Sequence, residues 1–255
     1  MVITRCAACV CFLLAHAGAA HAQAAGQLWA NVIVNWLASD NAVLRVDVEP
    51  KTQAFVRAAG RTFMTLEVTP HVEFTLAPWA DLVGELSLQR TTTSDHADSV
   101  STNPRVGVEL HILSRILRRS ARGGADREKL PRRRLAVSSL LRLERQNTFF
   151  DADTPTKSSW RFRDRFDLAY PLNRRKTTDD GAVYVTGDNE LFFPLERERG
   201  DPLVDQVRVR AGLGYRANFA WRFEALYVWT GTRNAGTGKL AVDSHAFDFR
   251  IRREF

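Results

Sequence analysis

Apolar and polar residues alternate along most of this chain, with the two-residue period of a β-strand that has one apolar and one polar face. In residues 42–49 aliphatic side chains alternate with arginine, aspartate and glutamate, and in residues 160–170 aromatic and aliphatic side chains alternate mainly with arginines. About eleven such segments follow one another from residue 27 onward, without a convincing amphipathic helix between them. The pattern therefore predicts an all-β protein.

Two all-β architectures fit this alternation: a soluble sandwich or barrel with its apolar face inward, and a membrane barrel with that face outward. The aromatic residues favour the membrane barrel. Trp221, Phe223, Tyr227 and Trp229 share one parity of a single strand, with tryptophan and tyrosine towards its ends. Amphipathic rings of this kind belong at bilayer interfaces. The opposite parity is also more heavily charged than the outer face of a soluble sandwich requires.

The first 22 residues have the features of a secretory signal peptide. Arg5 precedes an apolar run from Cys6 to Leu14, and the small residues around His21 form a cleavage site. The sequence therefore predicts two parts, a signal peptide at residues 1–22 and an exported barrel at residues 23–255. All the cysteines lie in the first part. We expect the exported protein to reside in the outer membrane of a Gram-negative cell.

The number of strands follows from a rule as well as from the pattern. Single-chain barrels of the bacterial outer membrane have an even number of antiparallel strands. We therefore expect a single closed antiparallel transmembrane β-barrel of twelve strands, with ten as the alternative. Long polar stretches at residues 91–104, 146–158, 194–201 and 230–239 are predicted to be loops at one end, and short turns at 77–80 and 216–218 lie at the other.

The last strand resembles the C-terminal signal that the barrel assembly machinery reads in outer-membrane proteins. Phe247, Phe249 and Ile251 alternate with charged residues, and Phe255 follows on the same parity. Arg253 lies on that parity too and departs from the pattern. The expected partners are therefore the assembly machinery during biogenesis and, afterwards, outer-membrane lipid and lipopolysaccharide.

The order of several short motifs resembles one family of outer-membrane barrels, called domain of unknown function 2490. The motifs are Trp29, LRLER (141–145), WRFRDRFDLAYPL (160–172), DNELFF (188–193), DQVRVRAGLGY (205–215) and SHAFDF (244–249). Each motif alone is degenerate, so their order and spacing carry the resemblance. It implies a barrel fold and an outer-membrane location, and it implies no activity.

In a membrane barrel the charged parity faces the lumen. Arginines and acids are nearly balanced there, with acids in excess before residue 110 and arginines in excess after residue 141. We expect ion pairs that hold a narrow interior shut, in a structural or narrow-channel role; the alternative is a transverse field across a small pore. The predicted lumen network comprises Arg142, Glu144, Arg161, Arg163, Arg165, Asp188, Glu190, Arg208, Arg210, Arg222, Glu224 and Arg250.

The arginine triplet of one strand gives the sharpest expectation. Arg161, Arg163 and Arg165 share one face, and an arginine facing lipid at mid-membrane costs roughly 2 to 4 kcal/mol. They should therefore point inward and meet acids. The neighbouring strands offer Glu144, Asp188 and Glu190, and the acid-rich opposite wall offers Glu67, Glu73 and Glu85.

Catalytic and metal-binding patterns are weak. The histidines of residues 23–255 are His71, His96, His111 and His245, which have no metal-ligand spacing and adjoin no recognisable nucleophile motif. We expect no catalytic residues, no metal and no cofactor. His71 and His111 are expected to form hydrogen bonds in the lumen. A lipid-modifying enzyme and a surface-exposed, adhesin-like protein stay open as alternatives.

One segment is strongly basic. Residues 114–134 contain nine Lys and Arg against two acids. Nucleic acid is not an expected partner in this compartment, because basic runs of barrels meet lipid phosphates or solvent. If Phe255 ends in the periplasm, the alternation of strands places this segment on the periplasmic side as well.

Overall fold

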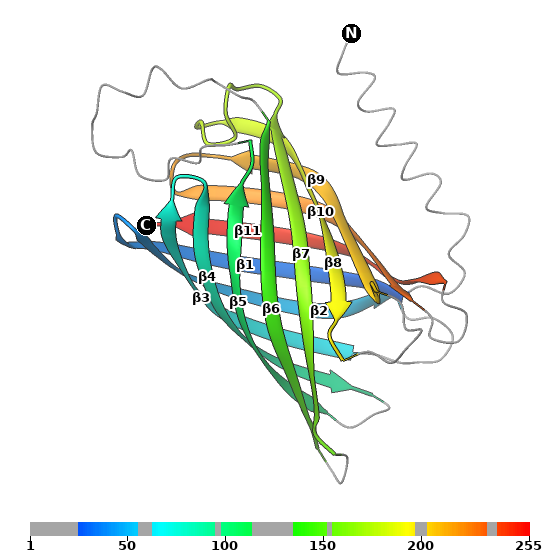
Figure 1. The fold of residues 1–255 in the computed structure, drawn as a ribbon. Coiled ribbons are helices and arrows are strands. Elements are labelled where there is room, and N and C mark those ends of the chain that lie inside the picture. The colour runs from blue at the N-terminus through cyan, green and yellow to red at the C-terminus, as the bar shows by residue number, and fades with distance from the viewer. Residues whose placement is uncertain are drawn as a thin grey trace.

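The computed structural model describes residues 25–55, 63–94, 98–113, 135–151, 155–196, 203–233 and 239–255. These residues form a closed all-β barrel (Figure 1). Its strands are β1 (Ala25–Ser39), β2 (Ala42–Phe55), β3 (Phe63–Ala77), β4 (Ala80–Thr93), β5 (Ser99–His111), β6 (Ala136–Phe150), β7 (Lys157–Pro171), β8 (Ala182–Pro194), β9 (Gln206–Arg216), β10 (Trp221–Arg233) and β11 (Leu240–Glu254). The predicted signal peptide and the basic segment 114–134 lie outside the described residues.

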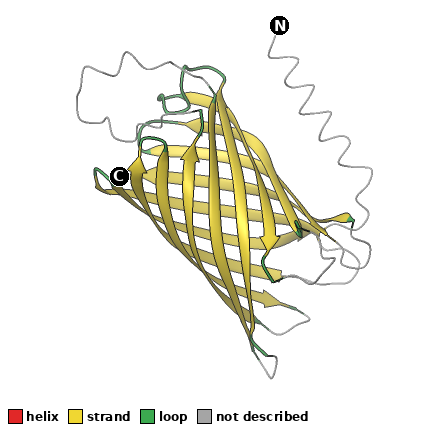
Figure 2. Ribbon diagram, viewed as in Figure 1, coloured by secondary structure: helices red, strands yellow, loops and turns green. Residues whose placement is uncertain are grey.

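The barrel closes with eleven strands in the described part of the chain, so the predictions of twelve and of ten are wrong. Strands that follow one another in sequence pair antiparallel, as expected. With an odd number, the first and last strands must run in the same direction, and β1 and β11 pair in parallel from Ala25 with Ser244 to Asn35 with Glu254. Figure 2 shows the continuous wall of strands that results. A parallel seam thus removes the need for an even count.

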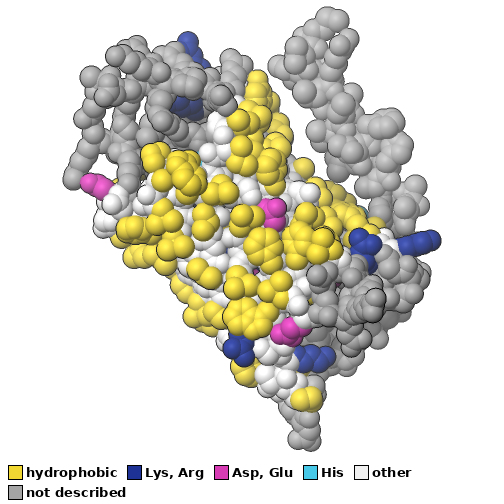
Figure 3. Space-filling view, in the orientation of Figure 1, with side chains coloured by type: hydrophobic (Ala, Val, Ile, Leu, Met, Phe, Trp, Pro, Cys, Tyr) yellow, Lys and Arg dark blue, Asp and Glu magenta, His cyan; other side chains and the backbone are white. Residues whose placement is uncertain are grey.

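The barrel has inverted polarity compared with a soluble protein. Along β1 the exposed fraction alternates from 46% for Val32 to 1% for Ile33, and Asn31 is also buried. The outward residues of the other strands are largely Leu, Val and aromatic side chains, and Figure 3 shows them spread over the visible outer face. Most charged residues of the strands occupy the inward parity. The sequence alternation therefore corresponds to an apolar outside and a charged inside.

The connections divide between the two ends of the barrel. The end that holds Phe255 has tight turns at residues 40–41 and 78–79, and it also has the longer connection at residues 172–181, where Gly181 adopts a left-handed φ of 72°. The opposite end holds all four of the predicted long stretches. The strands extend into each of those stretches: β4 and β5 reach Thr93 and Ser99, β6 and β7 reach Phe150 and Lys157, β8 reaches Pro194 and β10 reaches Arg233.

The last strand is anchored to the first at the Phe255 end. The backbone N–H of Phe255 donates to the carbonyl oxygen of Asn35 at 3.0 Å, and the ring of Phe255 stacks on Trp36 with centroids 6.1 Å apart. The seam is thus held by side chains as well as by backbone hydrogen bonds. None of the described residues belongs to a helix that is long and apolar enough to cross a membrane.

Candidate functional site in the barrel interior

The inward parity of β6, β7 and β8 places basic and acidic side chains beside one another. Register sets Glu144 opposite Arg161, Arg165 opposite Glu190, and Glu190 opposite Arg208 on β9. Opposite charges at directly facing positions of a sheet lie within reach of each other. The local alternation of three strands is thus enough to build the core of a charged cluster.

Glu190 is the most heavily contacted carboxylate of this cluster and has no exposed surface. Its Oε1 accepts hydrogen bonds from Arg142 Nη2 at 2.7 Å and from Arg163 Nη2 at 2.5 Å. Its Oε2 lies 3.4 Å from Arg208 Nη1 and 3.6 Å from Arg210 Nη2. Arginines from three different strands therefore converge on one carboxylate of β8.

Glu144 forms a second hub, which is also fully buried. Arg161 Nη2 donates to its Oε1 at 2.8 Å, and Arg163 Nη1 donates to its Oε2 at 2.7 Å. Arg163 therefore bridges Glu144 and Glu190 with its two terminal nitrogens. Charge-assisted hydrogen bonds of this geometry are about twice as strong as neutral ones.

The cluster continues across β5, β4 and β3 through residues that the predicted network left out. Arg142 Nη1 donates to Glu85 Oε2 at 2.8 Å, and Arg105 lies within 3.4 Å of Glu67, Glu85 and Glu144. Lys51 of β2 closes the row at 2.8 Å from Glu67. We call the whole set the central network: Lys51, Glu67, Glu85, Arg105, Arg142, Glu144, Arg161, Arg163, Asp188, Glu190, Arg208 and Arg210.

Gly107 explains how Arg142 reaches a carboxylate two strands away. Gly107 faces Arg142 in the β5–β6 register and points inward between β4 and β6. A Cβ atom at this position would lie 2.6 Å from Arg142 Cγ and 2.3 Å from the carbonyl oxygen of Leu141. Only glycine therefore leaves room for the Arg142 side chain to pass over β5 towards Glu85.

Buried aromatic rings fill the space between the charges. The guanidinium groups of Arg161, Arg163 and Arg208 lie 4.7 to 5.4 Å from the centre of the Phe192 ring. The Trp29 ring lies 4.9 Å from Lys51 Nζ and 5.5 Å from the Arg208 guanidinium. Such cation–π contacts strengthen when they are removed from water. Sequence reasoning missed Phe192, although it shares the parity of Asp188 and Glu190.

A second group of charges lies near the Phe255 end, and its ion pairs do not connect it to the central network. Glu224 accepts a hydrogen bond from Tyr184 Oη at 2.7 Å, and Arg250 contacts Asp248 at 2.7 Å. Arg222 faces Arg216 on one side and Arg252 on the other. We call this set the rim cluster: Arg216, Arg222, Glu224, Arg250, Arg252 and Glu254.

The rim cluster has too few carboxylates in contact with its arginines to neutralise their charge. Glu254 lies 3.3 Å from Arg216 and 3.7 Å from Arg222, so two arginines share one carboxylate. Arg252 makes no ion pair within the described residues, whereas every arginine of the central network makes at least one. The predicted network residues Arg222, Glu224 and Arg250 therefore belong to a cluster of a different kind.

Arg165 corrects the expectation for the arginine triplet. It points inward like Arg161 and Arg163, but it forms its ion pair with Asp167 of its own strand, at 2.9 Å, and not with an acid of a neighbouring strand. Its register partner Glu190 is already occupied by Arg142 and Arg163. Asp188, the other nearby acid, pairs with Arg210 at 2.8 Å.

The expected direct pairing across opposite walls is replaced by a chain of contacts around the wall. Glu67 and Glu85 reach the arginine-rich strands through Arg105 of β5 and Arg142 of β6, the neighbouring strands at which the two walls meet. Glu73 instead lies 3.7 Å from His71 of its own strand. Short carboxylate side chains meet long arginines on nearby strands before either can span the lumen.

The histidines occupy different surroundings. His71 Nδ1 lies 3.2 Å from Glu85 Oε1, and His111 Nε2 lies 2.8 Å from Asp81 Oδ2, so both contact lumen carboxylates. His245 lies on the outward parity of β11 and forms a hydrogen bond with Tyr227 Oη. His96 lies outside the described residues. No group of three or more potential ligands in the described part of the chain could hold a metal ion.

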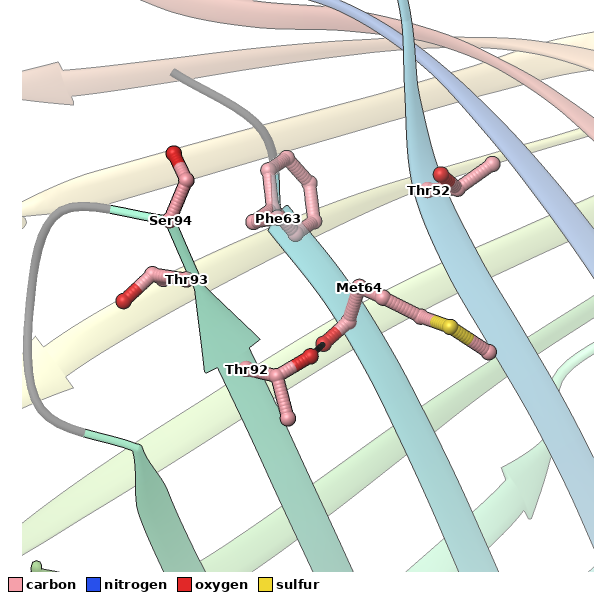
Figure 4. A pocket seen from close by; sticks show the side chains of 6 residues that line it. All are labelled: Thr52, Phe63, Met64, Thr92, Thr93 and Ser94. Carbon is pink, nitrogen blue, oxygen red and sulfur yellow. Dashed lines mark hydrogen bonds between the residues drawn. The ribbon is translucent and has the colours of Figure 1, made fainter.

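A surface hollow of about 250 Å³ lies at the far end of β3 from Phe255, between β2 and β4 (Figure 4). Thr52, Phe63 and Met64 line it on one side, and Thr92 donates to the Met64 carbonyl at 3.4 Å. The remaining lining residues are Thr93 and Ser94. None of these side chains is ionisable at neutral pH, so this hollow brings together no acid–base chemistry.

The residues of the predicted C-terminal signal share the outer face. Phe247, Phe249, Ile251 and Phe255 are 40 to 60% exposed and point away from the lumen. Phe247 also packs edge-on against Tyr227, with centroids 5.9 Å apart. These side chains therefore form an apolar strip along β11, with Arg253 as its one basic member.

Comparison with known proteins identifies a family but no activity. A family model with the description "Protein of unknown function (DUF2490)" matches residues 26–240, from the start of β1 to the first residue of β11. This match confirms the resemblance that the order of sequence motifs predicted. A search of curated proteins found no match.

Proposed function

The chain belongs to the DUF2490 family, and from its geometry we propose that it is an outer-membrane barrel with a structural or narrow-channel role. Its lumen is held shut at neutral pH by the central network. The observation that carries this proposal is the inverted polarity of the barrel, in which charged hubs with no exposed surface lie inside an apolar outer wall.

The outer wall supports the membrane location. The strands contain 11 to 15 residues, and a tilted strand needs roughly 9 to 11 to cross the bilayer core. Exposed Leu, Val and Phe side chains on this wall would be unfavourable in water and are favourable against lipid. Outer-membrane phospholipid and lipopolysaccharide are the proposed surroundings, and the assembly machinery is the proposed partner during insertion.

The interior supports a shut lumen. Glu144 and Glu190 are 0% exposed, and Arg142 and Arg163 are 4 to 6% exposed. A pore wide enough for hydrated ions would leave such hubs accessible to water. A selective open pore would line its constriction with charges of one sign, whereas the central network places five acids in direct ion pairs with seven basic residues.

Cell fractionation tests the location. We expect the protein to stay in the sarkosyl-insoluble outer-membrane fraction and to migrate faster on a gel before heating than after it. Deletion of Phe255 should reduce insertion more than substitution of Ser244, which points inward on the same strand. Recovery of the protein as a soluble periplasmic species would overturn the proposal.

Solute flux tests the shut interior. Proteoliposomes that contain the purified barrel should swell in isosmotic arabinose no faster than protein-free liposomes. Swelling at porin-like rates would contradict a closed lumen and leave the membrane location intact. The membrane location and the closed lumen can therefore be disproved independently of each other.

A lipid-modifying enzyme is the second candidate, and one observation favours it. His245 lies on the outer face, where lipid would reach it, and it is hydrogen-bonded to Tyr227. This candidate predicts turnover of phospholipid by the purified barrel and its loss in His245→Asn. Equal turnover by the two proteins, or none by either, would remove this candidate.

A further inference from the structure

Arg253 is the residue that departs from the apolar parity of the last strand, and the structure shows where it lies. Its guanidinium carbon is 4.7 Å from the centre of the Trp221 ring and 4.8 Å from that of Phe255. It therefore lies between two aromatic rings on the outer face, at the Phe255 end. No carboxylate of the described residues forms an ion pair with it, in contrast to most arginines of the lumen.

A hollow of about 440 Å³ lies on β8 to β11, with Phe223, Ala225, Phe249 and Ile251 of the outer parity in its lining. Glu224 and Arg250, which belong to the inward parity, also border it. Ala225 forms its floor, because this small side chain lies in register between Leu213 of β9 and Phe249 of β11. Phe223 and Ile251 line the hollow towards the Phe255 end. The surrounding side chains are large and Ala225 is small, so the outer wall is indented there.

The register aligns the cation with the hollow. Along the β10–β11 pair, Trp221 faces Arg253, Phe223 faces Ile251 and Ala225 faces Phe249. Successive outward residues of a strand are about 7 Å apart. The basic group therefore lies one row beyond the hollow, at the edge of the barrel, and the apolar indentation runs from it towards the middle.

We propose that this surface is a binding site for one glycerophospholipid, with the phosphate at Arg253 and an acyl chain in the hollow over Ala225. A glycerophospholipid carries an anion at one end and a flexible apolar chain at the other, which matches the order of charge and hollow along β10 and β11. The aromatic rings hold the guanidinium at the edge of the outer face. A phosphate can reach it there without moving a charged group into the hydrocarbon of the membrane. The site rests on the membrane setting proposed above.

Native mass spectrometry of the full mature barrel in detergent tests the site, with dioleoyl phosphatidylglycerol as the probe. We expect one retained lipid on the wild-type protein. Arg253→Gln should retain roughly fivefold less, the loss expected for one basic group near a phosphate. Ala225→Phe should also lower retention, because its ring would fill the hollow.

Arg145→Gln is the matched control, because Arg145 is also an arginine of the outer parity that lies over a tryptophan, 5.6 Å from the Trp160 ring, but on β6 and near the opposite end. It should bind as the wild type does. Dioleoylglycerol, which lacks the phosphate, should bind weakly to all four proteins.

Equal phosphatidylglycerol retention by wild type, Arg253→Gln and Ala225→Phe would overturn the site, as would equal retention of dioleoylglycerol by the wild type. Heat-modifiable mobility of each variant shows that the barrel is closed during this test. A soluble protein in cells would instead contradict the proposed function, so the two failures are distinguishable.

Discussion

The central network and the rim cluster lie inside the same barrel and have the same kinds of side chains, but they differ in how charge is compensated. In the central network Glu144 and Glu190 each contact three or more arginines, and Arg163 bridges them. In the rim cluster three arginines face one another on adjacent strands, and Glu254 is shared between two of them.

The number of buried charges therefore does not by itself determine how much they contribute to the stability of the barrel. A buried charge is costly unless its hydrogen-bonding capacity is met, and removal of one partner leaves the other uncompensated. Arginines that face each other directly are destabilising by themselves. The same loss of one guanidinium should therefore have a large cost in the central network and almost none in the rim cluster.

The largest effect is expected for Arg163→Glu. This change brings a third carboxylate beside Glu144 and Glu190, which lose their shared partner. The free energy of unfolding should fall by about 3 to 5 kcal/mol, as for other broken buried ion pairs. Urea unfolding in detergent micelles measures it. Phe162→Leu, on the outer face of the same strand, is the control, and it should lower the free energy of unfolding by only about 1 kcal/mol. A native unfolding curve for Arg163→Glu would show that the network does not stabilise the barrel.

A smaller effect is expected for Gly107→Ala. The added methyl group would collide with Arg142 Cγ, so Arg142 must withdraw from Glu85 or the strands must separate. Overpacking of this kind costs about 1 to 3 kcal/mol. Gly84→Ala is the matched control on β4, because its Cβ would meet only Val72 Cγ1, at 3.2 Å. Equal unfolding midpoints for the two variants would mean that Arg142 does not depend on the gap at Gly107.

The smallest effect is expected for Arg252→Gln in the rim cluster. Removal of this charge relieves repulsion with Arg222 and breaks no ion pair within the described residues. Stability should stay constant or rise by up to about 1 kcal/mol. Arg142→Gln is the corresponding variant in the central network. It leaves Glu85 and Glu190 short of a partner, so it should clearly lower the free energy of unfolding. Equal losses of stability in these two variants would remove the distinction between the two clusters.

The alternation of residues was enough to predict the strands and their two faces, because period two is a local property of each strand. The rule that single-chain barrels have an even number of strands did not predict how this barrel closes, because the parallel pairing of β1 and β11 depends on the whole chain. Strand ends were also misjudged. Thr91 and Ser101 lie in stretches predicted to be loops, yet their hydroxyl groups pair with Thr65 and Thr148 of neighbouring strands at 3.0 and 3.1 Å.

The candidate site was partly predictable for a similar reason. Parity placed Arg161, Arg163 and Glu190 inward, and sequential strands made Glu144 a neighbour of the first two. Parity does not say which acid each arginine selects, so the pairing of Arg165 with Asp167 was missed. The contact from Arg142 to Glu85 depends on the gap at Gly107, which requires the register of three strands.

Single-channel recording of the wild-type barrel in a planar bilayer at neutral pH tests whether ion pairs hold the lumen shut. Recovery of heat-modifiable protein from the same membranes verifies insertion. We expect no current steps above the lipid baseline for the wild type. Arg163→Glu barrels that remain folded should show current steps. Stable, reproducible wild-type steps of porin-like size would contradict a lumen shut by ion pairs.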